Sequence, residues 1–129
     1  MHVQDIAILK ALVSVAWADG RVTAEETQVI DGLLAGYHAT PSEAHEIRAF
    51  AREPKTLDDI AVSDLSLDDR RVLLQHAVLL TMVDGEQHEK ELAMLKDLAQ
   101  RLRIPALEVP GLLQTARLRA RDLLGSLKS

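Results

Sequence analysis

The sequence predicts an all-α fold, a bundle of about seven helices in a single domain over residues 1–129. Apolar residues recur at helical spacing along almost the whole chain, and no segment alternates with the period of two that marks a strand. Capping signatures stand where the periodic segments begin. Because aromatic residues make up 2% of the chain and cysteine is absent, the core must consist of Leu, Val, Ile and Ala without disulfides.

The first helix is expected over residues 3–18. Its apolar residues share one helical face: Ile6, Leu9, Leu12, Val13 and Ala16. The end of this segment, Ala16-Trp17-Ala18, is similar to the cleavage site of a signal peptide. However, Asp5 precedes the apolar run without any Lys or Arg, and Lys10 interrupts the run itself. We therefore interpret the segment as a helix of the folded domain.

The second and third helices are expected over 23–38 and 41–52. Thr23 is followed three residues later by Glu26, which is the spacing of a capping box. The sequence Thr40-Pro-Ser-Glu43 repeats that spacing and places a proline at the first helical position, where its missing N–H is not needed.

The second half of the chain supplies the remaining helices. Pro54 ends the third helix, Ser66-Leu-Asp-Asp69 resembles another N-terminal cap, and Pro105 and Pro110 bracket a short connection. We expect the four remaining helices at 57–63, 67–83, 88–102 and 110–126. The segment 57–63 would join the two halves of the chain.

An internal repeat relates residues 12–34 to residues 77–99. Aligned without gaps, the two segments share Val13/Val78, Asp19/Asp84, Gly20/Gly85, Glu26/Glu91 and Leu33/Leu98. In both copies an Asp-Gly turn follows an apolar helix and precedes a second helix that carries the glutamate. We therefore expect two helical hairpins related by a pseudo-twofold axis.

The two aspartates of this repeat need a compensating partner. Each follows a helix, so it faces the negative end of the helix dipole at a cost of about a few tenths of a kcal/mol. Gly20 and Gly85, by contrast, are ordinary left-handed helix stops. Either Asp19 and Asp84 reach across the turn to the free N–H groups of the next helix, or they bind a cation.

The cation hypothesis has a partial precedent in the calcium-binding loop. Asp19, Gly20 and Glu26 occupy the fifth, sixth and twelfth positions of that loop, as do their counterparts in the second copy. The first and third loop positions are apolar in both copies, which excludes a true calcium-binding hand and leaves a half-site. Glu26 also has a competing role as the partner of Thr23 in the capping box.

The second turn differs because His88 replaces the capping threonine. Asp84, His88 and Glu91 can share one side of the turn and the first helical winding, an arrangement that suits a divalent transition metal. The candidate metal ligands are therefore Asp19, Glu26, Asp84, His88 and Glu91, the identity of the ion being open. No nucleophile with a neighbouring base and no nucleotide-binding motif is present, so we expect neither catalysis nor an organic cofactor.

Charge and hydropathy narrow the classes of partner. The net charge is −5, but residues 101–129 carry +4 and the remainder −9. The few aromatic residues and negative total argue against nucleic acid, although Arg117, Arg119 and Arg121 could contact phosphates. No apolar run approaches the length of a membrane span. We expect a cytoplasmic protein with a protein partner and without membrane insertion, and a homodimer is compatible with these features.

The two Asp-Gly turns with their flanking helices resemble the TerB-like family of tellurite-resistance proteins. The resemblance rests on Ala-Asp-Gly-Arg-Val-Thr-Ala-Glu-Glu in the first copy, on Val-Asp-Gly-Glu in the second, and on Glu91-Leu92-x2-Leu95. It covers about 12–35 and 70–104 well. The module is also similar to the N-terminal region of a membrane-anchored DnaJ-like co-chaperone, whose anchor and His-Pro-Asp motif do not occur in this sequence.

This resemblance implies an all-helical, cytoplasmic bacterial protein that acts in the response to tellurite and other stress by binding rather than by catalysis. The acids that the family associates with metal correspond to Asp19, Glu26, Asp84 and Glu91. Two functions follow from the sequence. One is a stress-response module that binds a divalent cation at the two turns, and the other is a metal-free helical scaffold or co-chaperone-like domain.

Overall fold

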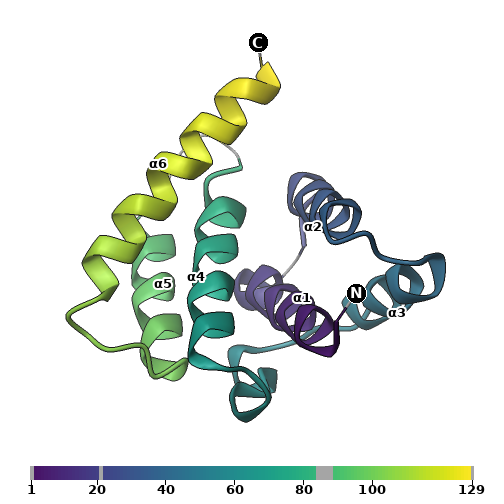
Figure 1. Cartoon of the computed structure of the whole chain (residues 1–129), viewed down its shortest axis with the longest axis horizontal. Helices are drawn as coiled ribbons and strands as arrows, with labels where there is room; N and C mark the ends of the chain where they lie inside the picture. Colours follow the sequence, from purple (N-terminus) through teal and green to yellow (C-terminus); the bar gives the residue numbers. More distant parts are fainter. Residues whose placement is uncertain (1, 21, 84–88, 129) are drawn as a thin grey trace.

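All regular elements in the described part of the chain are helical (Figure 1). The computed structural model describes residues 2–20, 22–83 and 89–128 and has no strand there. The described α-helices are α1 (Val3–Ala16), α2 (Ala24–Gly36), α3 (Pro41–Ala51), α4 (Leu67–Thr81), α5 (Glu89–Arg101) and α6 (Val109–Lys128). Three short 3₁₀-helices, η1 (Trp17–Asp19), η2 (Leu57–Asp59) and η3 (Val62–Asp64), lie between them. The all-α prediction is confirmed.

The segment 57–63, which we expected as a seventh helix, forms η2 and η3 instead. Ile60 lies between these turns with an extended backbone, and its side chain is buried. The Asp59 carboxylate accepts the backbone N–H of Thr56 at 2.7 Å. Side chains that form hydrogen bonds with nearby backbone groups offer those groups an alternative to the bonds of a continuous helix. Short turns with one buried apolar residue are therefore favoured here.

The centre of the fold is the contact between α1 and α4. Residues 8–9 and 11–16 of α1 are all buried, so this helix is enclosed on nearly every side. Leu73, Leu74, Ala77 and Val78 of α4 are equally inaccessible. The two helices with the most apolar surface therefore pack against each other, and the remaining helices cover them.

Each central helix carries two flanking helices. α2 and α3 pack on α1, whereas α5 and α6 pack on α4. Each predicted hairpin thus has one central helix and one flanking helix. The pseudo-twofold relation between the hairpins stays a prediction. Within residues 2–20, 22–83 and 89–128, no helix combines the length and hydropathy required to cross a membrane.

The predicted N-terminal caps of α2, α3 and α4 are confirmed. The side-chain oxygens of Thr23, Thr40 and Ser66 accept the backbone N–H of the residue three positions later at 3.1, 3.2 and 3.1 Å. In each case the acidic side chain of that later residue accepts the N–H of the cap in return. These reciprocal bonds satisfy N–H groups that no helical carbonyl reaches.

Two helices end at residues with a left-handed backbone that is unusual outside glycine. His38, two residues after α2, has a φ of 58°, and Arg103, two residues after α5, has a φ of 55°. The next residue folds back in both cases: Ala39 N–H donates to Leu34 at 3.0 Å, and Ile104 N–H donates to Ala99 at 3.2 Å. These are the bonds of a helix stop that usually contains glycine.

We predict that His38→Gly and Arg103→Gly each stabilise the protein. Both side chains are exposed, so little contact is lost. A residue with a Cβ in the left-handed conformation costs the folded state about 1–2 kcal/mol, and glycine removes this cost. The greater freedom of glycine in the unfolded chain cancels about 0.4–1 kcal/mol of the gain. Urea unfolding should show a net gain of about 0.5–1 kcal/mol for each change.

His38→Ala and Arg103→Ala are the matched controls, because they remove the same side chains but keep a Cβ. They should give no such gain. Gly20→Ala should destabilise by about 1–2 kcal/mol through backbone strain alone, since Gly20 has a φ of 94° and no atom lies within 4 Å of the added Cβ. Equal stability of the glycine and alanine variants would contradict the left-handed ends.

Candidate functional site

The first Asp-Gly turn is a tight link between α1 and α2. After α1 the chain forms η1, and Gly20 then adopts the left-handed conformation with its N–H donating to the Trp17 carbonyl at 2.8 Å. The indole N–H of Trp17 donates to the Ala51 carbonyl at 3.0 Å, which fastens this turn to the end of α3. The prediction that Gly20 stops the helix is confirmed.

Glu26 lies at the opening of α2 with its carboxylate directed back toward the turn. Its Oε1 accepts the Thr23 N–H at 3.0 Å, and its own N–H donates to the Thr23 hydroxyl at 3.1 Å. The capping role expected for Glu26 is therefore present. The same bonds hold the half-buried carboxylate beside the segment that follows Asp19.

The other predicted ligands are only partly within the described structure. Asp19 belongs to η1 by its backbone, but its side chain lies outside the described atoms, and Asp84 and His88 lie outside the described residues. Glu91 is the third residue of α5 and is half-buried. Among the described residues, no three His, Asp or Glu side chains are grouped closely enough to hold a metal ion. The five-residue cation site stays a prediction.

A shallow depression lies at the N-terminal ends of the two central helices. It has a volume of about 390 Å³ and is lined by His2, Gln4, Asp5, Asp64, Ser66 and Asp69. Asp5 accepts the His2 N–H at 3.2 Å, and Asp69 accepts the Ser66 N–H at 3.1 Å. Two of its three carboxylates thus serve as helix caps, where the positive end of the dipole stabilises them.

A tyrosine and a histidine join α2 to α4 across the bundle. The Tyr37 hydroxyl lies 2.9 Å from His76 Nε2, and the two rings meet edge to face. Burial lowers the pKa of His76 below its usual 6.5. Burial also raises the pKa of Tyr37, and the carboxylates of Asp5 and Asp69 add to that effect. Sequence analysis missed this pair, because nothing local relates residues 39 positions apart.

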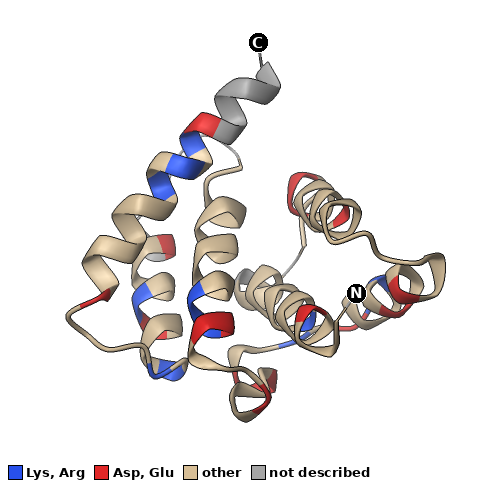
Figure 2. Cartoon of the chain, in the orientation of Figure 1, with Lys and Arg blue, Asp and Glu red and all other residues tan. Residues whose placement is uncertain are grey.

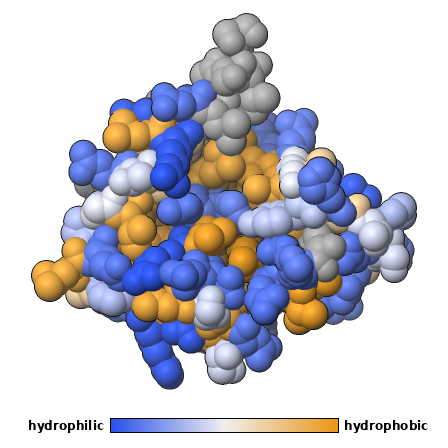
Figure 3. Space-filling model, viewed as in Figure 1, coloured by the Kyte–Doolittle hydropathy of each residue, from blue (hydrophilic) through white to orange (hydrophobic). Residues whose placement is uncertain are grey.

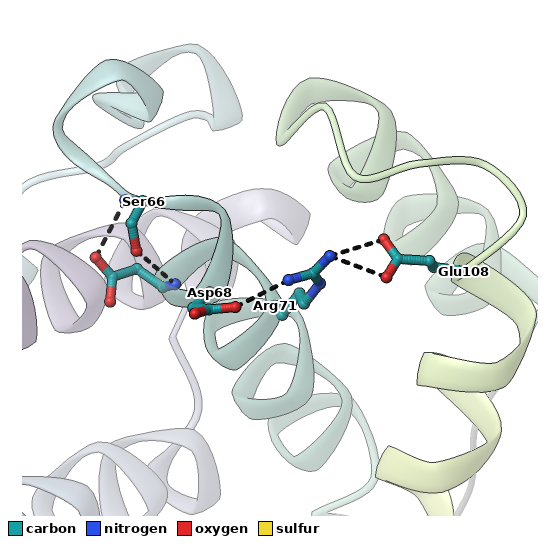
Figure 4. Close-up of polar contacts among 5 residues, drawn as sticks. Ser66, Asp68, Arg71 and Glu108 are labelled. Atoms are coloured by element: carbon teal, nitrogen blue, oxygen red, sulfur yellow. Dashed lines mark hydrogen bonds and ion pairs between the residues drawn. The ribbon is translucent and has the colours of Figure 1, made fainter.

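Arg71 joins α4 to the start of α6 (Figure 4). Its guanidinium donates to both carboxylate oxygens of Glu108, at 2.9 and 3.1 Å, and to Asp68 at 2.8 Å. These bonds raise the pKa of Arg71 further above its already high value. A planar guanidinium that binds one carboxylate through two contacts sets orientation as well as distance. No local sequence pattern indicated this contact, which orients α6 on the bundle.

We predict that His76 makes the stability of the protein depend on pH below neutrality. The folded state protonates His76 less readily than the unfolded chain does, because burial lowers its pKa. The stabilising contribution is therefore fully present above pH 6.5, the ordinary value. It declines as the pH falls from there toward the folded pKa. Urea unfolding at several pH values between about 5 and 7.5 measures this slope.

Two variants separate the titration from the hydrogen bond. His76→Gln should flatten the pH dependence in this range, because it removes the titrating group. Tyr37→Phe should cost about 1 kcal/mol at neutral pH through the lost hydrogen bond, yet keep the slope, because burial rather than Tyr37 lowers the pKa of His76. An unchanged slope in His76→Gln would assign the pH dependence to other groups.

Comparison with known proteins assigns this architecture to a family. A family model described as "Protein of unknown function (DUF533)" matches residues 2–116, which includes α1 to α5 and the first part of α6. No curated protein and no solved structure matches the chain. Because the match spans most of the sequence and both Asp-Gly turns, this chain belongs to the DUF533 family.

Proposed function

We propose that this chain is a non-enzymatic binding module of the TerB-like, tellurite-resistance type that takes a divalent cation at its two Asp-Gly turns. In this proposal, two pseudo-twofold-related hairpins, each with one turn, belong to a bundle of the TerB-like kind. The protein would act in the bacterial cytoplasm, in a stress response, and an ion would change how a protein partner recognises it.

The first turn provides the observation that carries this proposal. The capping box directs the Glu26 carboxylate back to the N-terminal end of α2, with Oε1 3.0 Å from the nitrogen of Thr23, three residues after Gly20. The backbone of Asp19 lies in the same short turn, immediately before the left-handed Gly20. A carboxylate has about four lone-pair positions, so accepting a backbone N–H is compatible with binding a cation.

The place of the turns in the fold supports the same function. They follow α1 and α4, the two central helices, and precede flanking helices of the two hairpins. An ion at a turn would therefore act on the link between a rigid core helix and a more peripheral helix. Oxygen donors from Asp and Glu suit Ca²⁺, Mg²⁺ or Mn²⁺, whereas an additional contribution from His88 would favour a transition metal such as Zn²⁺.

A metal-free interaction scaffold is the second candidate, and one contact favours it. The reciprocal bonds between Thr23 and Glu26 explain that glutamate by helix capping alone. In this case Asp19 and Asp84 only stabilise the turns, and the protein works through its exposed helical faces, as a co-chaperone-like domain would. A homodimer is compatible with both candidates.

Thermal melting of metal-stripped protein, with Ca²⁺, Mg²⁺, Mn²⁺ and Zn²⁺ added in turn, tests the cation proposal. An ion that binds only the folded state stabilises it by about 2.7 kcal/mol at 100 times its dissociation constant, so the midpoint should rise and saturate. Asp19→Asn/Asp84→Asn should abolish the rise, because asparagine still caps a helix but carries no charge. His88→Ala should lower the response to Zn²⁺ more than that to Ca²⁺.

Asp58→Asn/Asp64→Asn provides the control. It removes the same charge from exposed positions in η2 and η3, which precede α4, and it should melt with the same ion-dependent rise as the unaltered protein. Absence of a shift with all four ions would refute the cation proposal and favour the scaffold. If the control variant lost the ion-dependent rise to the same extent, the rise would come from non-specific screening of an acidic protein and not from a site at the turns.

A further inference from the structure

One side of the last helix packs on the bundle along the part whose side chains the structure describes. Leu113, Ala116 and Ala120 of α6 are buried and lie on the side of the helix that contacts α4. The C-terminal part of α6 continues beyond the end of α4 and away from the other helices (Figure 1). A surface helix that extends from the body of a domain presents its remaining faces to other molecules.

Three arginines lie on the second half of α6, beside the buried Ala116 and Ala120. Figure 2 shows them as a group of blue segments on α6, which the sequence identifies as Arg117, Arg119 and Arg121. In the described part of the chain, none of the three forms an ion pair, whereas Arg48 of α3, Arg71 of α4 and Arg101 of α5 each do. The buried Nε atom of Arg117 has no hydrogen-bond partner among the described atoms, as is also true of Arg70 and Arg71. Three positive charges are thus close together on α6, with Asp122 as the neighbouring acid.

An exposed leucine completes this surface. At about 100° per residue, Arg117, Leu118 and Arg121 fall within about 100° of one another around the helix, on a flank next to the buried stripe. Leu118 is 54% exposed, although it belongs to a helix whose other apolar residues up to Ala120 are buried or half-buried. Arg121 and Arg117 lie on one side of Leu118, about 60° and 100° away around the helix, and Asp122 lies about 40° away on its other side. We call this set, Arg117, Leu118 and Arg121, the α6 flank.

We propose that the α6 flank binds an acidic amphipathic helix of a partner protein. An apolar side chain of that helix would cover Leu118, and carboxylates beside it would pair with the guanidiniums of Arg117 and Arg121. Arginine is suited to this contact, because its planar group binds carboxylates through two bonds and is weakly hydrated. The proposed function includes a protein partner, and this inference names the surface that binds it and the chemistry that the partner needs. It does not depend on whether the turns bind an ion.

Other occupants fit the flank less well. A second copy docked symmetrically through the same flank would bring Arg117 and Arg121 against their own equivalents. A nucleic acid would meet three arginines on a chain whose net charge is −5 and whose aromatic content is 2%. A membrane surface needs a broad apolar face, whereas Leu118 is the one large apolar residue exposed on α6 in the described part of the chain. Figure 3 shows that hydrophilic and apolar residues are interspersed over the visible surface.

The test uses the full chain and a designed probe. The probe is a fluorescent peptide of about 20 residues, long enough to match α6. Its leucines are spaced to form one helical stripe, and glutamates flank the stripe. A second peptide carries Gln in place of every Glu. Fluorescence anisotropy is recorded with EDTA present at about 50 mM and about 300 mM NaCl, because paired charges on a surface weaken with salt.

We expect saturable binding of the acidic peptide, weaker binding at high salt, and little binding of the Gln peptide. Arg117→Glu/Arg121→Glu should weaken affinity at least about tenfold, and Leu118→Ser should weaken it by a smaller factor. Arg121→Glu alone is included because Arg121 is exposed, so this change should leave the fold intact. Arg52→Glu/Arg103→Glu makes the same charge change at exposed positions on other elements and should bind like the unaltered chain.

Several outcomes would overturn the inference. Absence of saturable binding, or equal weakening by the Arg52 and Arg103 control, would remove the α6 flank as a specific site. Tighter binding of a single-stranded RNA or of phosphatidylserine vesicles than of the acidic peptide would assign the surface to those anions. A dimer seen by light scattering that becomes monomeric in Arg121→Glu would make the flank a contact between copies. Because EDTA removes divalent ions, these binding results do not depend on the cation proposal, which the melting experiment tests.

Discussion

The packing of α1 against α4 is the constraint on which the rest of the structure depends. These helices hold the largest continuous group of buried leucines and valines, and α1 is apolar on almost every side. A helix of that composition is stable in water only when neighbours surround it. With few aromatic residues available, the core relies on interlocking aliphatic side chains, whose contacts are individually small and collectively large. The flanking helices are needed because they complete this enclosure.

This arrangement explains where the chain places its polar groups. The N-terminal ends of α1 and α4 open at one shallow depression, where Asp5 and Asp69 cap the helices. The Asp-Gly turns follow the opposite ends of the same two helices. The first turn is therefore anchored on a rigid element, which suits a binding site whose ligands must be held in place. Two of the polar contacts between elements, Tyr37 with His76 and Arg71 with Glu108, connect flanking segments to α4.

α6 both packs on the central helices and carries the surface proposed to bind a partner. Its first turns are held by Glu108 bound to Arg71 and by the buried side chains that face α4. Its later described turns carry three arginines that form no ion pair in the described part of the chain. The family match ends at residue 116, immediately before the three arginines. The α6 flank thus lies outside the part of the chain that the family model matches.

The sequence by itself determined the elements of this protein. Helical periodicity, reciprocal caps such as Thr40 with Glu43, and Gly20 as a helix stop all depend on residues within a few positions of one another, so their outcome is local. Sequence reasoning also identified the Asp-Gly repeat as the candidate site, and the structure adds the bond from the Thr23 N–H to the Glu26 carboxylate.

Only the tertiary structure decided which helices are central, how segment 57–63 folds, and which distant groups meet. Segment 57–63 has polar residues with helical spacing, yet Ile60 is drawn into the core with an extended backbone. His38 and Arg103 take the left-handed conformation that sequence rules reserve for glycine, because the chain must turn there. The partners Tyr37 and His76 are 39 positions apart, and Arg71 and Glu108 are 37 apart. Such contacts depend on how the apolar faces of all helices are buried together, which no local pattern encodes.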